Sequence, residues 1–153
     1  MPGGLGPEQP HDALTAARFS ITIDGYEIAS FSELQGITTE VEPVSFMESS
    51  DKEVILKQLP GKAVPGKVVL KRGKNQSMEL WAWHESVLQG NMVSARKSCS
   101  LVMYNFDGAP VARYHLENAW PSKLEVGALK AGASEVLMET VTIVCERIQR
   151  VTG

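Results

Sequence analysis

Residues 59–83, LPGKAVPGKVVLKRGKNQSMELWAW, decide how this chain is interpreted. The segment combines a Pro60-Gly61 turn, a short apolar strand that ends at Lys71 and Arg72, and the start of a helix with two tryptophans. It supplies a strand with basic flanks next to an aromatic helix, but no residue set suited to catalysis. We therefore interpret it as part of a surface that packs against other copies of the chain.

Composition indicates an ordinary globular protein with one folded domain. The chain has 153 residues, of which 43% are hydrophobic and 22% charged, with a formal net charge of −3. This charge gives no general reason to expect nucleic acid or an anionic membrane as a partner. No apolar run approaches the roughly 20 residues of a membrane span, and the first residues lack the order of a signal peptide. We expect cytoplasmic synthesis, a flexible leader at 1–17 and a domain at 18–153.

Alternation of apolar and polar residues predicts β-strands from the start of this domain. Residues 18–24 have the period of a half-buried strand, the Asp24-Gly25 pair predicts a tight turn, and residues 26–35 return as the partner strand. Residues 37–47 are a third extended segment. Pro43 within it lacks an N–H group, which indicates a sheet edge or a bend there.

The alternation weakens at residues 49–66, where we expect a long polar loop. A helix is expected at 75–90, with Asn75 as its N-cap and Gly90 at its end. The other expected elements are a strand at 68–70, a hairpin of 98–105 and 111–116 around Asp107-Gly108, an extended segment at 120–126, a loop at 130–134 and a strand at 136–148. Together they predict a mainly β fold, an antiparallel β-sandwich or barrel of about seven strands with one flanking α-helix.

Residues that could support chemistry are sparse and badly spaced. The three histidines, His11, His84 and His115, form no metal-binding spacing, and neither a nucleophile elbow nor a phosphate-binding glycine loop is present. Cys99 and Cys145 lie among apolar, β-branched residues, and we interpret them as buried, reduced thiols. We therefore predict a protein that is not an enzyme and binds no cofactor or metal.

A concentration of positive charge marks the centre of the chain. The basic residues are Lys52, Lys57, Lys62, Lys67, Lys71, Arg72 and Lys74, and the acidic ones are Asp51 and Glu53. One interpretation is a solvated basic face. Another is contact with an acidic surface on a neighbouring copy, either Glu40 with Glu42 or Glu135 with Glu139. Nucleic acid is a third, weakened by the absence of interleaved aromatic residues.

Two tryptophans lie two positions apart in the expected helix. A helix directs side chains at that spacing about 200° apart, so Trp81 and Trp83 cannot both face one core. Either one is buried and the other anchors an interface from the outer face, or the two are shared between the core and a sheet edge.

The order and spacing of several short motifs resemble the tail tube protein family of contractile phages and of phage-like contractile injection systems. The resemblance covers roughly residues 18–150. The motifs are Leu59-Pro60-Gly61, Val69-Leu70-Lys71-Arg72-Gly73, Leu80-Trp81-Ala82-Trp83, Gly90, Asp107-Gly108, Ala119-Trp120-Pro121 and Glu139-Thr140-Val141-Thr142-Ile143.

This resemblance implies a structural subunit of an inner tube. Six copies would form a ring, and stacked rings would form a hollow tube that carries cargo and is driven through a target envelope when a surrounding sheath contracts. The implied partners are further copies of the chain, the sheath protein, baseplate and tail-terminator proteins, and a cargo or tape-measure protein in the lumen. The implied location is the cytoplasm at synthesis and then an assembled tail or injection particle.

By position, residues 49–66 would bridge subunits and successive rings, with the 75–89 helix outside. The residues expected at the assembly interface are Glu40, Glu42, Asp51, Lys52, Glu53, Lys57, Lys62, Lys71, Arg72 and Trp81. The rival interpretation is a monomeric β-barrel that binds a small apolar ligand between its sheets, with Trp120 or Tyr114 lining the cavity. A split-barrel enzyme that binds a cofactor is a more distant third.

Overall fold

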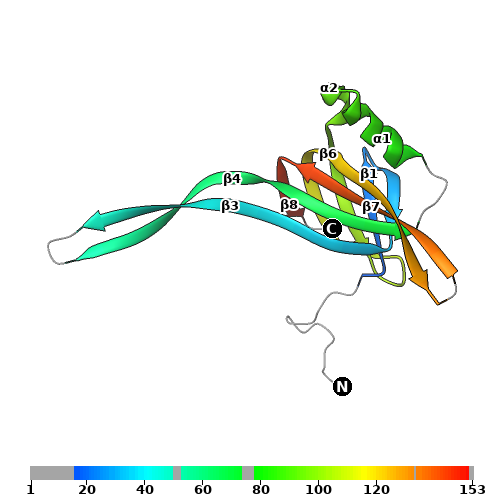
Figure 1. Ribbon diagram of the computed structural model, residues 1–153, viewed down its shortest axis with the longest axis horizontal. Coiled ribbons are helices and arrows are strands. Elements are labelled where there is room, and N and C mark those ends of the chain that lie inside the picture. The colour runs from blue at the N-terminus through cyan, green and yellow to red at the C-terminus, as the bar shows by residue number, and fades with distance from the viewer. Residues whose placement is uncertain (1–15, 50–52, 74–77, 133, 152–153) are drawn as a thin grey trace, which may run out of the picture.

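The computed structural model describes residues 16–49, 53–73, 78–132 and 134–151 (Figure 1). Its strands are β1 (Arg18–Ile23), β2 (Tyr26–Phe31), β3 (Glu33–Ser49), β4 (Val54–Gly73), β5 (Lys97–Tyr104), β6 (Pro110–Ala131), β7 (Ser134–Cys145) and β8 (Arg147–Val151). Its helices are α1 (Glu79–Leu88) and the single turn α2 (Met92–Ala95). The mainly β, antiparallel fold is confirmed, although the sequence analysis expected one helix and overlooked α2.

Strand β6 joins the two halves of the sheet system. Its first half pairs with β5 and β8, and its second half pairs with β7, which in turn pairs with β4. The strand order is therefore β2-β1-β5-β6-β7-β4-β3, with β8 as a branch on β6. The β2 end of this path comes back to β4, where Ser32 N, just after β2, donates a 3.1 Å hydrogen bond to Lys71 O. The result is a curved, barrel-like sandwich.

Local turn chemistry fixes two of its hairpins, as predicted. Asp24 and Gly25 have φ values of 52° and 83°, and Gly108 has a φ of 85°. Such left-handed conformations suit Asp and Gly, because Gly has no Cβ and Asp tolerates this region. The Asn105 side-chain oxygen adds support by accepting hydrogen bonds from the backbone N–H groups of Asp107 and Ala109.

Several predicted boundaries were wrong. The long loop expected at 49–66 is largely strand, because β3 runs to Ser49 and β4 starts at Val54. The two strands pair with each other as one long hairpin. Residues 120–126 are not a separate strand but part of the 22-residue β6. The strand expected at 136–148 is interrupted at Glu146, after which β8 begins. The expected helix start at Asn75 lies outside the described residues, and α1 begins at Glu79.

The core lies between the two halves of the sheet, and α1 closes one side of it. Leu80 and Trp83 of α1 are buried, and Trp83 Nε1 donates a 2.6 Å hydrogen bond to Ala95 O. Cys99 and Cys145 belong to the same core. The other fully enclosed core side chains include Ile21, Phe31, Val68, Leu70, Leu101, Leu116, Val141 and Ile143.

Candidate assembly surface

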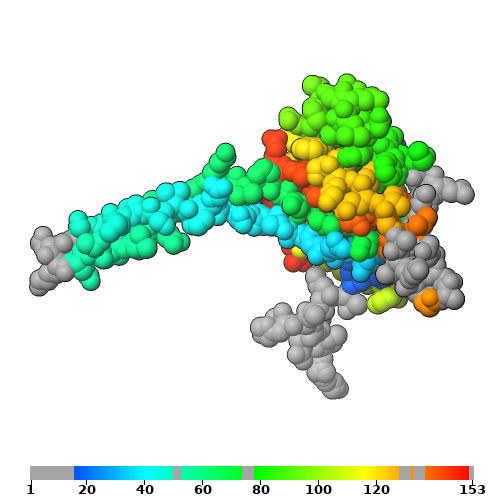
Figure 2. Space-filling view, in the orientation of Figure 1, coloured from blue at the N-terminus to red at the C-terminus, as the bar shows by residue number. Residues whose placement is uncertain are grey.

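The outer parts of β3 and β4 project from the body as a long ribbon, which we call the arm (residues 41–49 and 54–64; Figures 1 and 2). Residues 67–71 of β4 pair with both β3 and β7, whereas the described part of the arm is held together by β3–β4 pairing. Both of its edges are therefore unpaired within the subunit. An isolated two-stranded hairpin is at best marginally stable in water, so the arm needs further support.

The arm is unusually apolar for an exposed ribbon. Eight of its large apolar side chains are between 39% and 70% exposed. They are Val41, Val44, Phe46, Met47, Val54, Ile55, Leu56 and Leu59. Long, exposed apolar strand edges invite pairing or aggregation unless a partner covers them.

The strand register separates the arm into two faces. Met47 lies opposite Leu56, and Ser45 lies opposite Gln58. Because side chains alternate across a strand, these pairs share one face. We call it the uncharged face, since it carries no ionisable side chain: Pro43, Ser45, Met47, Ser49, Val54, Leu56, Gln58 and Pro60.

The opposite face carries apolar residues together with one ion pair. Lys57 Nζ lies 2.5 Å from Glu48 Oε2, and both side chains are about half exposed. Val44 and Phe46 share this face by register. Lys57, predicted to contact another copy, already has an acidic partner within its own arm.

Close backbone packing shapes the base of the arm. Pro43 faces Pro60 across the two strands, and the register shifts between Val41 and Pro43. A Cβ atom added to Gly61 would lie 2.5 Å from Val44 Cγ2, closer than real Cβ atoms approach a neighbour. Glycine at position 61 therefore allows Val44 to lie against the partner strand.

Two predicted interface residues are buried inside the subunit instead. Arg72 and Glu139 are 3% and 1% exposed and face each other across β4 and β7. Arg72 Nε lies 3.5 Å from Glu139 Oε1, and the Phe31 ring lies under the guanidinium, 5.6 Å from Cζ. The alternative in which Glu135 and Glu139 meet basic residues of a neighbouring copy therefore loses Glu139, which is buried beside Arg72. Each of these charges needs the other, because a charge buried away from water is unfavourable unless a counter-charge lies close to it.

Trp81 belongs to the same buried group. Its Nε1 donates a 2.6 Å hydrogen bond to Glu139 Oε2, and the side chain is half-buried, while Trp83 is 6% exposed. Nearby, His84 Nδ1 lies 2.9 Å from Pro121 O. Trp81 thus connects α1 to the buried ion pair.

The remaining predicted interface residues are distributed along the hairpin. Glu40, Glu42 and Lys62 are exposed at the base of the arm, so the acidic and basic groups predicted to meet between copies lie in one hairpin. Lys71 is half-buried near the end of β4, and Glu53 is exposed just before β4. Asp51, Lys52 and Lys74 lie outside the described residues, as does the side chain of Glu135.

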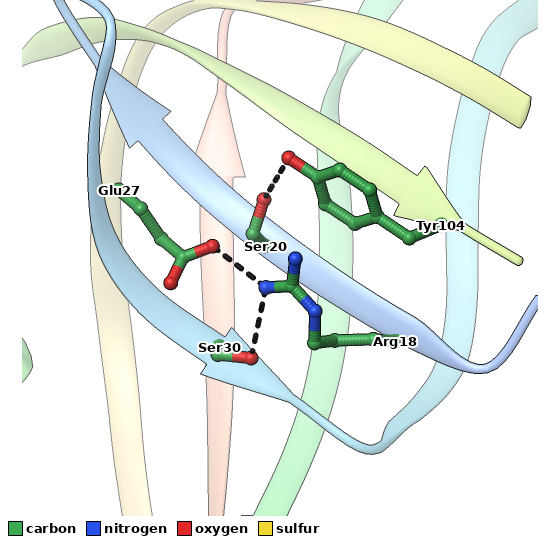
Figure 3. A network of polar contacts seen from close by, with 5 residues as sticks. All are labelled: Arg18, Ser20, Glu27, Ser30 and Tyr104. Atoms are coloured by element: carbon green, nitrogen blue, oxygen red, sulfur yellow. Dashed lines mark hydrogen bonds and ion pairs between the residues drawn. The ribbon is translucent and has the colours of Figure 1, made fainter. Parts of the chain in front are cut away.

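A polar cluster on the body ties β1, β2 and β5 together (Figure 3). Arg18 Nη1 lies 2.7 Å from Glu27 Oε1 and donates a 3.4 Å hydrogen bond to Ser30 Oγ. The Arg18 guanidinium also lies over the Tyr104 ring, 4.1 Å from its centroid, and Ser20 Oγ is 3.4 Å from Tyr104 Oη. Each contact joins neighbouring strands, which indicates a structural role.

Three surface clefts lie among the described residues, and none of the three corresponds to the rival ligand site. Three clefts are lined respectively by β3, β4, β6 and β7 residues, by residues around α1 and the β1–β2 hairpin, and by residues around Arg72. Trp120 and Tyr114 line none of these three. Tyr114 instead lies beneath the Arg150 guanidinium, 5.9 Å away.

The two cysteines are free, buried thiols, as predicted. Burial raises the pKa of Cys99 to about 12, with a further contribution from the nearby Cys145, and raises the pKa of Cys145 to about 11. Raised pKa values keep both thiols protonated and unreactive at neutral pH. Among the described residues, no three or more His, Cys, Asp or Glu side chains are arranged to hold a metal ion. The described helices include none that is long and apolar enough to span a membrane.

Solved structures with the same fold include a chain of a prophage baseplate, a chain of an extracellular contractile injection system and an Hcp1 protein. The chain resembles one in the cryo-EM structure of the anti-feeding prophage (AFP) baseplate, with a TM-score of 0.69, 20% identity, and coverage of 92% of this chain and 95% of that chain. A chain of the PVC sheath–tube complex of an extracellular contractile injection system gives a TM-score of 0.69 at 14% identity, covering 94% of both chains. Hcp1 from Flavobacterium johnsoniae gives a TM-score of 0.51 at 16% identity, covering 88% of this chain and 95% of that chain.

The family comparison covers nearly the whole chain. No curated protein matches the sequence. The family model described as T4-like virus tail tube protein gp19 matches residues 15–149, which include both strands of the arm and all of α1. The chain therefore belongs to this family of tail tube proteins.

Proposed function

We propose that this tail tube protein forms six-membered rings that stack into the hollow inner tube of a contractile tail or injection system. The sheath would surround this tube, baseplate and terminator proteins would close its ends, and cargo or a tape-measure protein would occupy the lumen. The similar chains in a baseplate, a sheath–tube complex and a tube-terminating cap support this set of partners.

The observation that carries the proposal is the apolar arm. A monomer would expose eight large apolar side chains on a ribbon with two unpaired edges. Contact with identical neighbours would cover these side chains and supply the support that the ribbon lacks. Such head-to-tail contacts close into rings or continue as stacks, depending on the rotation between copies.

Charges would then set the register between copies, and apolar area would supply affinity. Glu40, Glu42 and Lys62 remain exposed at the base of the arm for this purpose, and Lys71 lies near the other end of β4. Lys57 contributes less than the sequence implied, because Glu48 already neutralises it. We infer a purely structural role, with synthesis in the cytoplasm followed by incorporation into the particle.

Electron microscopy of the purified protein tests this function. We expect rings or tubes of uniform bore in negative stain, and sedimentation at a mass well above one chain. In the matched control, the two residues Asn-Gly replace residues 44–59, so that a tight turn links Pro43 to Pro60 and the outer arm is removed. This control should retain the β-rich circular dichroism spectrum of the body but sediment as a monomer.

Two outcomes would contradict the proposal. One is a full-length protein that stays monomeric over a wide concentration range, even beside baseplate partners. The other is a shortened variant that assembles as well as the full-length chain. Co-purification of a small apolar ligand with the monomer would favour the rival barrel instead.

A further inference from the structure

A hollow on the body surface lies at the opposite end of the sheet from the arm. It has a volume of about 380 Å³ and is lined by Glu33, Lys71, Glu125, Val126, Gly127, Met138 and Thr140. We call it the Met138 hollow. The arm leaves one end of the molecule, and the β6–β7 hairpin projects from the other (Figure 1). The arm of one copy therefore cannot reach the hollow of that same copy.

Gly127 leaves this hollow open next to Met138. The two residues lie opposite each other in the β6–β7 register, and both line the hollow. A Cβ atom added to Gly127 would have no neighbour within 4 Å, so this position opens into free space. The absent side chain of Gly127 leaves room for an incoming side chain beside Met138.

The charges of the hollow are balanced at its rim. Glu33 lies directly opposite Lys71 in the β3–β4 register. Glu125 Oε1 lies 3.4 Å from Lys123 Nζ. The hollow and its rim therefore already hold charges of both signs, and an added charge would have to be desolvated next to these groups.

The uncharged face of the arm matches this requirement in chemistry and size. Met47 and Leu56 lie opposite each other on that face and are 70% and 65% exposed. A cavity of about 150 Å³ holds a benzene molecule, so a hollow of this size has room for about two such side chains.

We propose that the Met138 hollow receives Met47 and Leu56 from the arm of a second copy. This inference rests on the proposed tube function and names the surface that one subunit offers to the next. The contact is head to tail, because the two surfaces differ and lie at opposite ends of the folded subunit. Repeating it adds copies without limit unless the geometry closes.

Filling the hollow tests the contact. Gly127→Leu should block the arm and abolish rings and tubes in negative stain, while the thermal unfolding of the subunit stays unchanged. Gly36→Leu is the matched control, since Gly36 of β3 also has open space around its Cβ position. This control should assemble normally. Normal assembly of Gly127→Leu would overturn the assignment.

Cross-linking separates this assignment from the tube function itself. Leu56→Cys and Met138→Cys are made as separate chains, mixed, oxidised and separated on non-reducing gels. We expect a band of doubled mass that requires both variants. Leu56→Cys mixed with Ser94→Cys, at the cleft beside α1, is the control and should give none.

The outcomes of the two assays are distinguishable. Tubes that form without the Leu56–Met138 cross-link, or with a cross-link to residue 94 instead, would overturn the Met138 contact and leave the tube function standing. A wild-type protein that forms neither rings nor tubes would overturn the tube function as well. The native Cys99 and Cys145 are each 2% exposed and should not contribute to the cross-link.

Discussion

The buried contact between Arg72 and Glu139 offers a sharp test of how the subunit is stabilised. Glu139 interacts with Arg72 through Oε1 and accepts a hydrogen bond from Trp81 through Oε2. Glu139→Gln keeps the size of the side chain and an oxygen that can accept the Trp81 hydrogen bond. It removes the negative charge and leaves Arg72 as a buried cation that has lost its partner.

The structure sets the expected magnitude. Removing one partner of a buried ion pair costs about 3–5 kcal/mol, because the other charge stays buried. The Arg72–Glu139 distance of 3.5 Å is long, and Arg72 Nε and Nη2 and Glu139 Oε1 form no hydrogen bond within the described part of the chain. We therefore expect the lower end, about 3 kcal/mol. For a domain of this size, that lowers the Tm by about 6–12 °C.

Urea unfolding followed by tryptophan fluorescence measures this loss, at concentrations where the protein is monomeric. Trp81→Phe is the first control, because it removes the hydrogen bond but leaves the ion pair, and should cost less than Glu139→Gln. The second control is the double variant Arg72→Met with Glu139→Leu. It removes both charges together, although it also removes the acceptor of the Trp81 hydrogen bond, and should therefore be more stable than Glu139→Gln. A Glu139→Gln stability within about 0.5 kcal/mol of wild type, the range of ordinary surface changes, would refute the reasoning.

Three further predictions concern the arm and the core. Leu56→Ser should raise the concentration needed for assembly about tenfold, because partial burial of a leucine contributes about 1–2 kcal/mol. Sedimentation measures this concentration. Val93→Ser is the control and should have no effect, because Val93 is 99% exposed. Gly61→Ala should prevent assembly in negative stain without lowering the Tm of the body, because its Cβ would meet the packed side chain of Val44; an assembling variant would contradict this. Burial raises the pKa of Cys99 from 9.0 to about 12, so its contribution to stability is complete below pH 9 and is lost as the pH rises toward 12. Urea unfolding should therefore show a decline of about 1.4 kcal/mol per pH unit from this thiol, absent in Cys99→Val; equal slopes in both proteins would count against it.

Local signals in the sequence predicted much of the fold. The Asp24-Gly25 and Asp107-Gly108 turns were identified because left-handed backbone chemistry is local and needs no knowledge of the rest of the chain. The alternating strands and the aromatic helix were identified for the same reason. Local signals cannot define strand pairing, however. The register of β7 between β4 and β6 became available only with the structure.

The arm was missed because its prolines and lysines disguise a strand. Pro60 and Pro65 suggested turns, yet Pro60 faces Pro43 in a ribbon where both edges are free and a missing N–H group costs little. Lys57 suggested a polar loop, but its charge is paired with Glu48. Glu48 lies on the partner strand, two residues after Phe46, which is directly opposite Lys57. The apolar residues between these positions carry the structural information.

The assembly surface expected from the sequence stays a prediction, and the structure places its residues in different surroundings. The expected segment projects from the body, but Arg72 of the expected interface is buried beside Glu139. Sequence spacing alone could not reveal this, because the two residues are 67 positions apart and meet only through the pairing of β4 with β7. The Met138 hollow was equally hidden, since its lining residues come from four different strands.

These placements change the physical basis of assembly from charge to shape. Lys57 and Arg72 are two of the cations in the predicted electrostatic contact, and both have acidic partners within their own subunit. Attraction between copies must therefore come mainly from apolar area on the arm, which is non-directional and proportional to the surface covered. Apolar area alone would not choose one register over another. The exposed charges at the base of the arm and the hollow around Met138 can choose a register together. The hollow contributes because it accepts side chains at one position on the body, at the end that the arm of the same copy cannot reach.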